Sequence, residues 1–282
     1  MWESIQNYEP VIRLSVFLGI FTAVALWETV APRRARTFPR LTRWPNNIGL
    51  VILNTGVLRV LFPTAAVGMA LAAEANGWGL FNVFPLPGWL AVVLAVVILD
   101  FVIYLQHILV HAVPALWRLH RMHHADLDFD VTTGARFHPL EIVLSMVLKL
   151  MVVGALGAPA LAVMIFEVIL NATAMFNHGN IRLPDSVDRV LRLIVVTPYI
   201  HRVHHFVIVE ETNSNFFFNL PCWDRLFATY TYLPPDGHEG MTIGIAQFRD
   251  SRALRLDRML IQPFLETAED VPINRAGGGD GG

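Results

Sequence analysis

Apolar residues gather in five long runs that are separated by short polar stretches and occupy the first two thirds of the chain. They cover residues 11–31, 48–73, 89–105, 142–157 and 159–174. About 20 apolar residues suffice to cross the hydrocarbon core of a bilayer. The pattern therefore predicts an all-α, polytopic membrane bundle of four to five hydrophobic segments.

Two of these runs depart from a simple span. Arg59 and Pro63 lie inside the second run. Because proline interrupts helical hydrogen bonding, we expect a kink or a break there, or two half-buried helices. The fourth run is short for a full span, so it fits either a tilted or a re-entrant helix.

The first run has an alternative interpretation as a cleaved signal peptide. Such a peptide begins with positive charge, whereas here Glu3 and Glu9 precede the run and no basic cluster comes before Arg13. We therefore interpret the first run as a membrane span.

The loop after the first run indicates the orientation of the chain. Its sequence, PRRARTFPRLTR, contains five arginines and no acidic residue, and the positive-inside rule assigns such loops to the cytoplasm. Counting spans from there places residues 76–87 outside, and residues 117–140 and those after Asn177 inside. All the histidines then lie on the cytoplasmic side. We expect an integral protein of the bacterial inner membrane with its active site on the cytoplasmic face.

Composition agrees with a membrane protein and excludes several classes. The chain of 282 residues is 54% apolar and only 16% charged, against roughly 25% charged in soluble domains. A net charge of −2 provides no basic field, so a nucleic-acid partner is not expected. Cys222 is the single cysteine, which excludes an intramolecular disulfide and a cysteine-rich metal site. We expect one membrane-embedded domain over residues 1–275 and a disordered glycine-rich tail over 276–282.

Eight of the eleven histidines form three clusters. Two clusters repeat the pattern H-x-x-H-H, which exceeds what chance gives in a chain of this length. Residues three and four apart lie on one face of a helix, so we expect the imidazoles of each cluster to project together as catalytic metal ligands. The clusters are His107 and His111; His120, His123 and His124; and His201, His204 and His205.

Three further histidines stand alone in the sequence. His178, in FNHGN, lies at the cytoplasmic end of an apolar run between asparagines that can hold its ring, and we predict that it is a metal ligand. His138, in RFHPLE, lies at the same depth; we include it in the metal set, although a structural role is nearly as well supported. His238 follows a turn-like PPDG segment, and we predict that it is not a ligand.

Asp100 shares one helical stripe with Tyr104, His107 and His111. A buried carboxylate at this position either orients an imidazole or a tyrosine near the metal, or acts as a capping or pore-lining acid. Both interpretations stay open.

Ten candidate imidazoles exceed what one ion binds, whereas two ions with about five ligands each fit the number. Nitrogen-rich sites suit iron, zinc, copper or nickel. Structural zinc sites close with four ligands, often including cysteine, and the carboxylate pattern of soluble di-iron bundles is missing from the sequence. The remaining interpretation is a histidine-only site for two metal ions, whose neutral ligands leave the ions electrophilic and suited to activating dioxygen.

Three stretches, DFVIYLQHILVH, LWRLHRMHH and TPYIHRVHH, resemble the histidine motifs of the fatty acid hydroxylase or sterol desaturase superfamily of membrane di-iron oxygenases. RFHPLE, FNHGN and NFFFNLPCWDRLFATY add to the resemblance, which covers residues 100–230. Two positions depart from the family pattern: Phe217 stands where relatives often have glycine, and Ala228 replaces an expected glycine. These departures concern the shape of the substrate pocket more than the metal centre.

The resemblance implies a cytoplasmic cap of histidine-bearing helices that encloses two irons above a lipid-accessible tunnel. The reaction it implies is hydroxylation of an unactivated C–H bond in a sterol, fatty acyl chain, carotenoid or ether lipid. O2 is the co-substrate, and an external donor such as a ferredoxin or a cytochrome b5-like protein supplies electrons. No G-x-G-x-x-G fingerprint for a flavin or nicotinamide follows a strand in the sequence, which agrees with an external donor.

Two alternatives remain. A desaturase would use the same di-iron site, since both reactions share the first hydrogen abstraction. A non-catalytic metal transporter or metal-binding protein would distribute polar residues through its spans. Here the histidines stop at one face, and the apolar runs contain few charges, among them Arg13, Arg59, Asp100, Lys149 and Glu167.

Overall fold

The computed structural model describes residues 2–232, 237–267 and 273. Within these residues every named element is a helix, and the only extended pairings are two isolated bridges, Pro32 with Ile181 and Phe206 with Ile243. The predicted all-α fold class is confirmed. The tail predicted over residues 276–282 lies outside the described residues.

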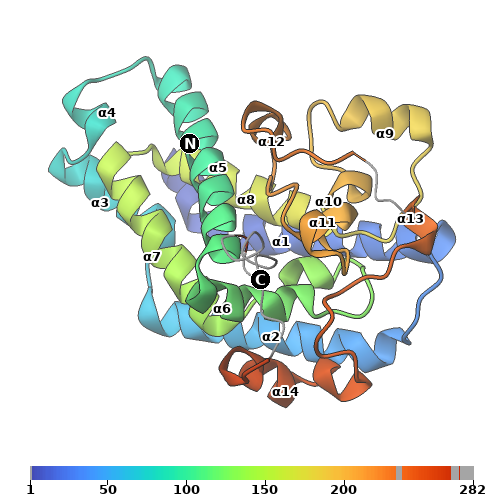
Figure 1. Cartoon of the computed structure of the whole chain (residues 1–282). Helices are drawn as coiled ribbons and strands as arrows, with labels where there is room; N and C mark the ends of the chain where they lie inside the picture. Colours follow the sequence, from blue (N-terminus) through green and yellow to red (C-terminus); the bar gives the residue numbers. More distant parts are fainter. Residues whose placement is uncertain (1, 233–236, 268–272, 274–282) are drawn as a thin grey trace, which may run out of the picture.

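Five segments are long and apolar enough to cross a membrane, which confirms the four to five hydrophobic segments that the sequence predicts. Their helices occupy the left and lower parts of Figure 1. They are α1 (Trp2–Val30), α2 (Arg40–Leu61) with α3 (Ala65–Asn76) and α4 (Leu80–Val83), α5 (Gly88–Ala112), α7 (Pro139–Leu156) and α8 (Ala160–Asn177).

The second apolar run is broken rather than kinked. Helix α2 ends at Leu61 and α3 begins at Ala65, with Pro63 between them, because proline lacks the N–H that a continuing helix needs. Helix α3 then packs against α7 and α8. Of the expected alternatives, the break is the one that the structure shows.

Two glycines join the outer loops of the bundle. A Cβ atom on Gly79 would lie 2.0 Å from the backbone nitrogen of Gly157, so only glycine fits at this close approach. Gly157 has φ +59° and ends α7 before the turn into α8. The loop after α3 and the α7–α8 turn therefore lie at the same end of the bundle.

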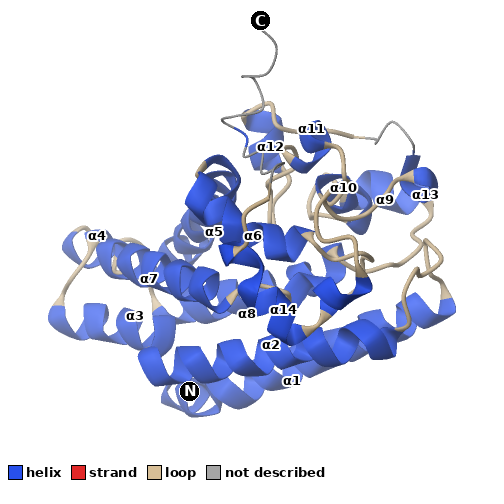
Figure 2. Cartoon of the chain, turned by 60° about the horizontal axis from the view of Figure 1, so that its bottom comes forward, coloured by secondary structure: helices blue, strands red, loops and turns tan. Residues whose placement is uncertain are grey.

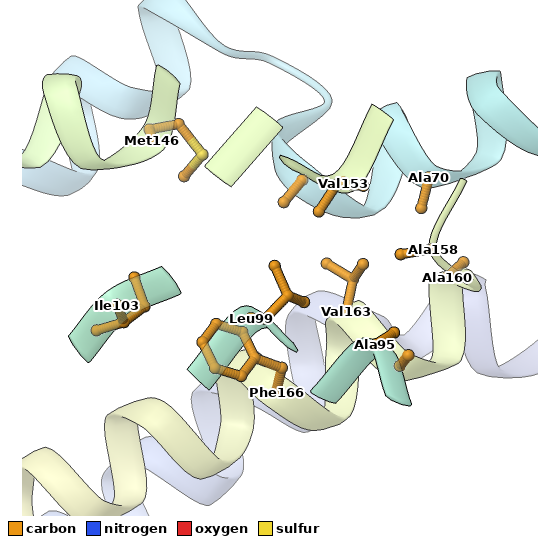
Figure 3. Packing of buried hydrophobic residues seen from close by; sticks show 12 residues of the cluster. Ala70, Ala95, Leu99, Ile103, Met146, Val153, Ala158, Ala160, Val163 and Phe166 are labelled. Atoms are coloured by element: carbon orange, nitrogen blue, oxygen red, sulfur yellow. The ribbon is translucent and has the colours of Figure 1, made fainter. Parts of the chain in front are cut away.

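Small residues dominate the core between α3, α5, α7 and α8. Ala70, Ala95 and Ala160 are buried and surround Leu99 and Phe166 (Figure 3). Small side chains let membrane helices approach closely. Large apolar side chains such as those of Leu14, Leu18 and Ile52 are instead exposed on the outside of the bundle, as a helix facing lipid requires.

Shorter helices cover the other end of the bundle and form a cap (Figure 2). They are α6 (Pro114–His124), α9 (Asp185–Leu191), α10 (Pro198–His204), α11 (Val209–Thr212), α12 (Cys222–Leu226), α13 (Gly237–Gly240) and α14 (Leu256–Ile261), together with the short turns η1 (Thr133–Ala135), η2 (Ser251–Leu254) and η3 (Gln262–Phe264).

The arginine-rich loop holds the cap onto the bundle. The guanidinium of Arg43 is fully buried and donates to Asp126 at 2.7 and 2.8 Å and to Asp130 at 2.5 Å. Arg34 donates to the backbone carbonyls of His238 and Met241. The loop therefore supplies specific contacts in addition to the positive charge from which we predict its side of the membrane.

The direction of each helix relative to the cap follows from these contacts. Helices α1, α5 and α8 end at the cap, where Ala31 accepts from the backbone N–H of Arg182 and where His111 and His178 lie. Helices α2 and α7 begin there, at Arg43 and His138. This is the alternation that the counted spans require.

Candidate metal centre

Nine buried histidines converge where the bundle meets the cap, and they form two groups. Within each group the candidate ligand atoms all lie within 4.8 Å of one another. The first group is His107, His111, His120, His124 and His204, and the second is His123, His178, His201 and His205.

The two H-x-x-H-H motifs each serve both groups. Helix α6 gives His120 and His124 to the first group and His123 to the second, and the α10 segment gives His204 to the first and His201 and His205 to the second. The prediction that each cluster projects together is therefore wrong in this respect. Pairs four residues apart share a group, because they lie one turn apart on one face, while the histidine between them, His123 or His204, turns toward the other group.

Most of these rings are oriented by an oxygen acceptor at Nδ1. The shortest contacts to backbone carbonyls join His107 to Phe216 and His204 to Ser214, both at 2.7 Å. An acceptor at Nδ1 fixes the proton on that nitrogen and leaves a lone pair on Nε2. The other acceptors are Glu141 for His120, Asn213 for His111, and the carbonyls of Arg136 for His123 and of Ala174 for His178.

The freed lone pairs face one another. The Nε2 atom of His107 lies 3.2 Å from that of His120 and 3.0 Å from that of His204. In the second group, the Nε2 atom of His178 lies 3.2 Å from that of His123 and 3.1 Å from that of His201. Two lone pairs at this distance repel each other, and a cation between them turns the repulsion into coordination.

Other ring nitrogens in the groups have no partner among the described residues. Both nitrogens of His124 and of His205 are buried without a hydrogen bond, as is Nε2 of His111. A buried polar atom without a partner costs about 1–3 kcal/mol. An all-imidazole donor set suits iron, zinc, copper or nickel, so the residues present fit the predicted metal ions.

Burial keeps several of these imidazoles neutral. It lowers the pKa of His204 to about 3 and that of His178 to about 4. Burial, reinforced by neighbouring histidines, also holds the pKa of His123, His124 and His205 well below the usual value. Metal ligands must be unprotonated, so the rings are ready to coordinate at neutral pH.

His138 lies outside both groups, contrary to the interpretation that it belongs to the metal set. It caps α7, where its Nδ1 accepts from the N–H of Leu140, and its Nε2 lies 3.2 Å from the carbonyl of Leu260. Both ring nitrogens are therefore engaged. His238 is also outside both groups, with its ring 4.9 Å from that of Tyr199.

Asp100 contacts none of the histidines of the two groups. Its carboxylate accepts from Asn219 at 2.7 Å and from the indole of Trp223 at 2.8 Å. Asp100 thus joins α5 to the segment that leads into α12, and neither of the two roles weighed from the sequence describes it.

The sequence did not single out Glu141 as part of the site. Its Oε1 lies 2.7 Å from Nδ1 of His120, although the two residues are 21 positions apart in the chain. The only sequence signal is its place in RFHPLE, next to a histidine that is not in either group.

We expect Glu141→Ala to weaken metal binding by about 10- to 100-fold, the usual effect of losing a partner that orients a ligand. Glu141→Gln keeps an acceptor oxygen at the same place and should retain most of the affinity. Competition of the purified protein with an iron chelator measures both. An alanine variant that binds iron as tightly as the unmodified protein would contradict this role.

The two departures from the family pattern lie away from the cavity that borders the site. Phe217 is buried against Val196 and Ile200, and Ala228 is exposed with φ +58°. Neither belongs to the wall of the cavity that reaches the first histidine group. A residue with a Cβ atom loses about 1–2 kcal/mol in this left-handed conformation, which explains why glycine is expected at position 228.

Ala228→Gly should therefore raise the thermal stability of the detergent-solubilised protein, by about 1 kcal/mol. The same substitution inside a helix, Ala172→Gly in α8, should lower it by about 1 kcal/mol. Thermal unfolding of both variants beside the parent protein tests the pair. Equal destabilisation by the two changes would mean that position 228 carries no backbone strain.

A cavity of about 320 Å³ reaches the first histidine group from inside the bundle. His107 and His120 belong to its wall, together with apolar side chains that include Ile103, Val110 and Met146. Its size falls at the lower end of the range for small-molecule sites.

Comparison with known proteins places this geometry in a family. The fatty acid hydroxylase family matches residues 92–229, a segment that contains all nine histidines. The chain is 29% identical over 229 residues to the ornithine lipid hydroxylase of Rhizobium tropici, covering 78% of this chain and 67% of that protein. No solved structure matches the chain.

Two alkylglycerol monooxygenases are also similar. The protein of Xenopus tropicalis is 27% identical over 194 residues, covering 65% of this chain and 41% of the relative. That of Homo sapiens is 27% identical over 191 residues, covering 64% and 40%. The chain thus spans about two fifths of these relatives' length. The resemblance of the three histidine motifs to the fatty acid hydroxylase superfamily is confirmed.

Proposed function

We propose that this chain is a membrane-bound, O2-dependent oxidoreductase that hydroxylates a C–H bond of a lipid at a site for two iron ions. The observation that carries the proposal is the pair of buried all-histidine groups, the first of which reaches the wall of a cavity inside the membrane bundle. Support comes from the family, which depends on iron, and from relatives that are named as lipid hydroxylases and monooxygenases.

The five histidines of the first group would hold one iron and the four of the second group the other. Bound iron supplies the chemistry that reduces dioxygen and oxidises an unactivated C–H bond. Since all nine side chains would bind as neutral imidazoles, they would leave the positive charge of the ions uncompensated and the ions electrophilic.

Aromatic side chains exclude water from the site. The ring of Trp117 lies 4.9 Å from that of His111, and the ring of Phe137 stacks on His123 at 4.5 Å. Phe129 covers His178 at 5.3 Å. A dry site protects reactive species from side reactions with water.

The cavity is the proposed substrate site. Its apolar wall suits an acyl or alkyl chain, and only His107 and His120 of the nine histidines line it. A chain bound there would approach the first group, so we assign C–H oxidation to that side of the centre. The electrons would come from an external donor such as a ferredoxin or a cytochrome b5-like protein.

Metal analysis and product analysis test the proposal together. The purified protein should contain about two iron ions per chain, and cells that express it should accumulate a hydroxylated lipid that control cells lack. A product with a new double bond would favour desaturation at the same site. Bound metal with no change in any lipid would favour the metal-binding alternative.

The single cysteine tests the proposed side of the membrane. Cys222 is exposed on the cap, so a membrane-impermeant thiol reagent should label it only after the cells are permeabilised. In a Cys222→Ser background, Asn76→Cys at the opposite end of the bundle should react in intact cells. Labelling of Cys222 in intact cells would place the cap outside.

A further inference from the structure

The cavity that reaches His107 is lined by charged residues as well as apolar ones. Lys149, the one lysine of the chain, belongs to its wall with Arg13 and Glu167. All three belong to membrane-spanning segments. Charges at this depth are costly to bury and mark functional positions by default.

These side chains form a continuous series of ion pairs. Lys149 Nζ donates to one oxygen of Glu167 at 2.7 Å, and Arg13 Nη1 donates to the other oxygen at 2.7 Å. Arg13 also contacts Glu9 at 2.8 Å. The formal charges of the four groups cancel, so a further polar group that binds here should carry no net charge.

The two cations keep hydrogen-bonding capacity beyond these ion pairs. Each oxygen of Glu167 accepts one of their bonds, whereas an ammonium has three N–H donors and a guanidinium five. Among the described residues, Lys149 Nζ has one acceptor, and the Arg13 side chain is 33% exposed. A purely hydrocarbon occupant would leave these donors unsatisfied next to it, which is unfavourable.

The same charges lie at a fixed distance from the metal groups. Lys149 follows Glu141 by eight residues on α7, which corresponds to about 12 Å along the helix, and Glu141 contacts His120. A polar group held at Lys149 would therefore set which carbon of an attached chain reaches the first histidine group.

We propose, on the basis of the function proposed above, that Lys149 and Arg13 bind the polar group of the lipid substrate. The substrate is then a lipid whose polar group has no net charge and offers carbonyl or carboxylate oxygens, as in a zwitterionic N-acyl amino acid lipid or an acylglycerol. Hydrocarbons without such a group are poor substrates. Glu167 is a positioning residue that holds both cations.

Lys149→Met tests this assignment, because it removes the charge at similar length and leaves Glu167 paired with Arg13. Arg59→Met is the matched control, since Arg59 is an exposed charge in α2 that does not line the cavity. Lys149→Arg keeps the charge. All three variants should retain the iron content of the parent protein.

Equilibrium binding is measured without reductant, so its outcome does not depend on the proposed oxidation. The probes are an N-acyl amino acid lipid with free amine and carboxylate, its methyl ester, the monoacylglycerol and the alkane of equal chain length. Lys149→Met should weaken binding of the polar probes by at least about tenfold and leave alkane binding unchanged. Tighter binding of the zwitterion than of its ester would select the amino acid lipid over the acylglycerol.

Product position gives a second readout, which a merely structural ion pair would not move. The parent protein, Lys149→Arg and Arg59→Met should each oxidise one carbon, whereas Lys149→Met should give a mixture of positions. Unchanged probe binding and a single product position in Lys149→Met would overturn the assignment. If neither the parent protein nor any variant oxidises the lipid while the expected binding pattern is observed, the proposed hydroxylase function is refuted instead.

Discussion

His204→Ala is expected to lower bound iron and to abolish lipid oxidation. The ring of His204 is held by the carbonyl of Ser214 at 2.7 Å, and its Nε2 lies 3.0 Å from that of His107. Its loss removes one ligand of the first group and breaks the lone-pair contact with His107, which borders the cavity. We expect activity to fall below detection, because the other ligands of this group cannot reposition without moving α5 or α6.

The fold should survive this substitution. The largest apolar core, between α3, α5, α7 and α8, is built from alanine, valine, leucine and phenylalanine and contains none of the histidines. Size-exclusion chromatography and helical circular dichroism in detergent should match the parent protein, while iron per chain falls.

His138→Ala is the matched control for this experiment. His138 lies at the same end of the bundle, but its contacts are to Leu140 and Leu260 rather than to the two groups. Loss of this cap should cost about 1 kcal/mol of stability and leave iron in place. A fully active His204→Ala protein would refute the metal centre.

The membrane segments and most members of the two histidine groups could be predicted because both depend on local sequence. Hydrophobic runs report helices directly, and the spacing of three and four within H-x-x-H-H brings imidazoles to one helix region. The division of these histidines between two groups depends instead on how α6 and α10 are rotated about their axes when they pack. The spacing of residues within a motif does not determine that rotation.

Long-range contacts account for the errors. His138 resembles a ligand by its depth, but a carbonyl 122 residues later engages its Nε2. Glu141 acquires its role only when α7 is placed beside α6. The same applies to Arg43, which the sequence presents as a loop charge and which the structure buries between Asp126 and Asp130.

Arg43 also shows why counting the charges of a loop does not fully describe what its arginines do. The positive-inside rule treats arginines as unpaired charges that stay on one side. Burial by itself raises the pKa of the Asp126 carboxyl. The guanidinium groups of Arg43 and Arg136 outweigh this effect and lower that pKa to about 2. Acidic residues of the cap therefore neutralise part of the positive charge of this loop. The same ion pairs attach the cap to α2.

The alanine variants of His178 and His238 give a second test of the metal centre. His178 follows the last turn of α8 and lies between two ligands, with its Nε2 at 3.2 Å from that of His123 and 3.1 Å from that of His201. Its group has four members, so His178→Ala leaves three, fewer than a closed site needs. We expect bound iron to fall from about two ions per chain to about one, with loss of most activity.

His238→Ala should keep its iron and most of its activity. Burial, reinforced by the nearby Arg202, lowers the pKa of His238 to about 3, so the ring is neutral. Neutrality alone does not make a ligand, however, because the ring packs on Tyr199 at 4.9 Å and lies outside both groups. The metal-to-protein ratio of the two purified variants decides the matter: an intact His178→Ala beside an iron-depleted His238→Ala would mean that the second group is assigned wrongly.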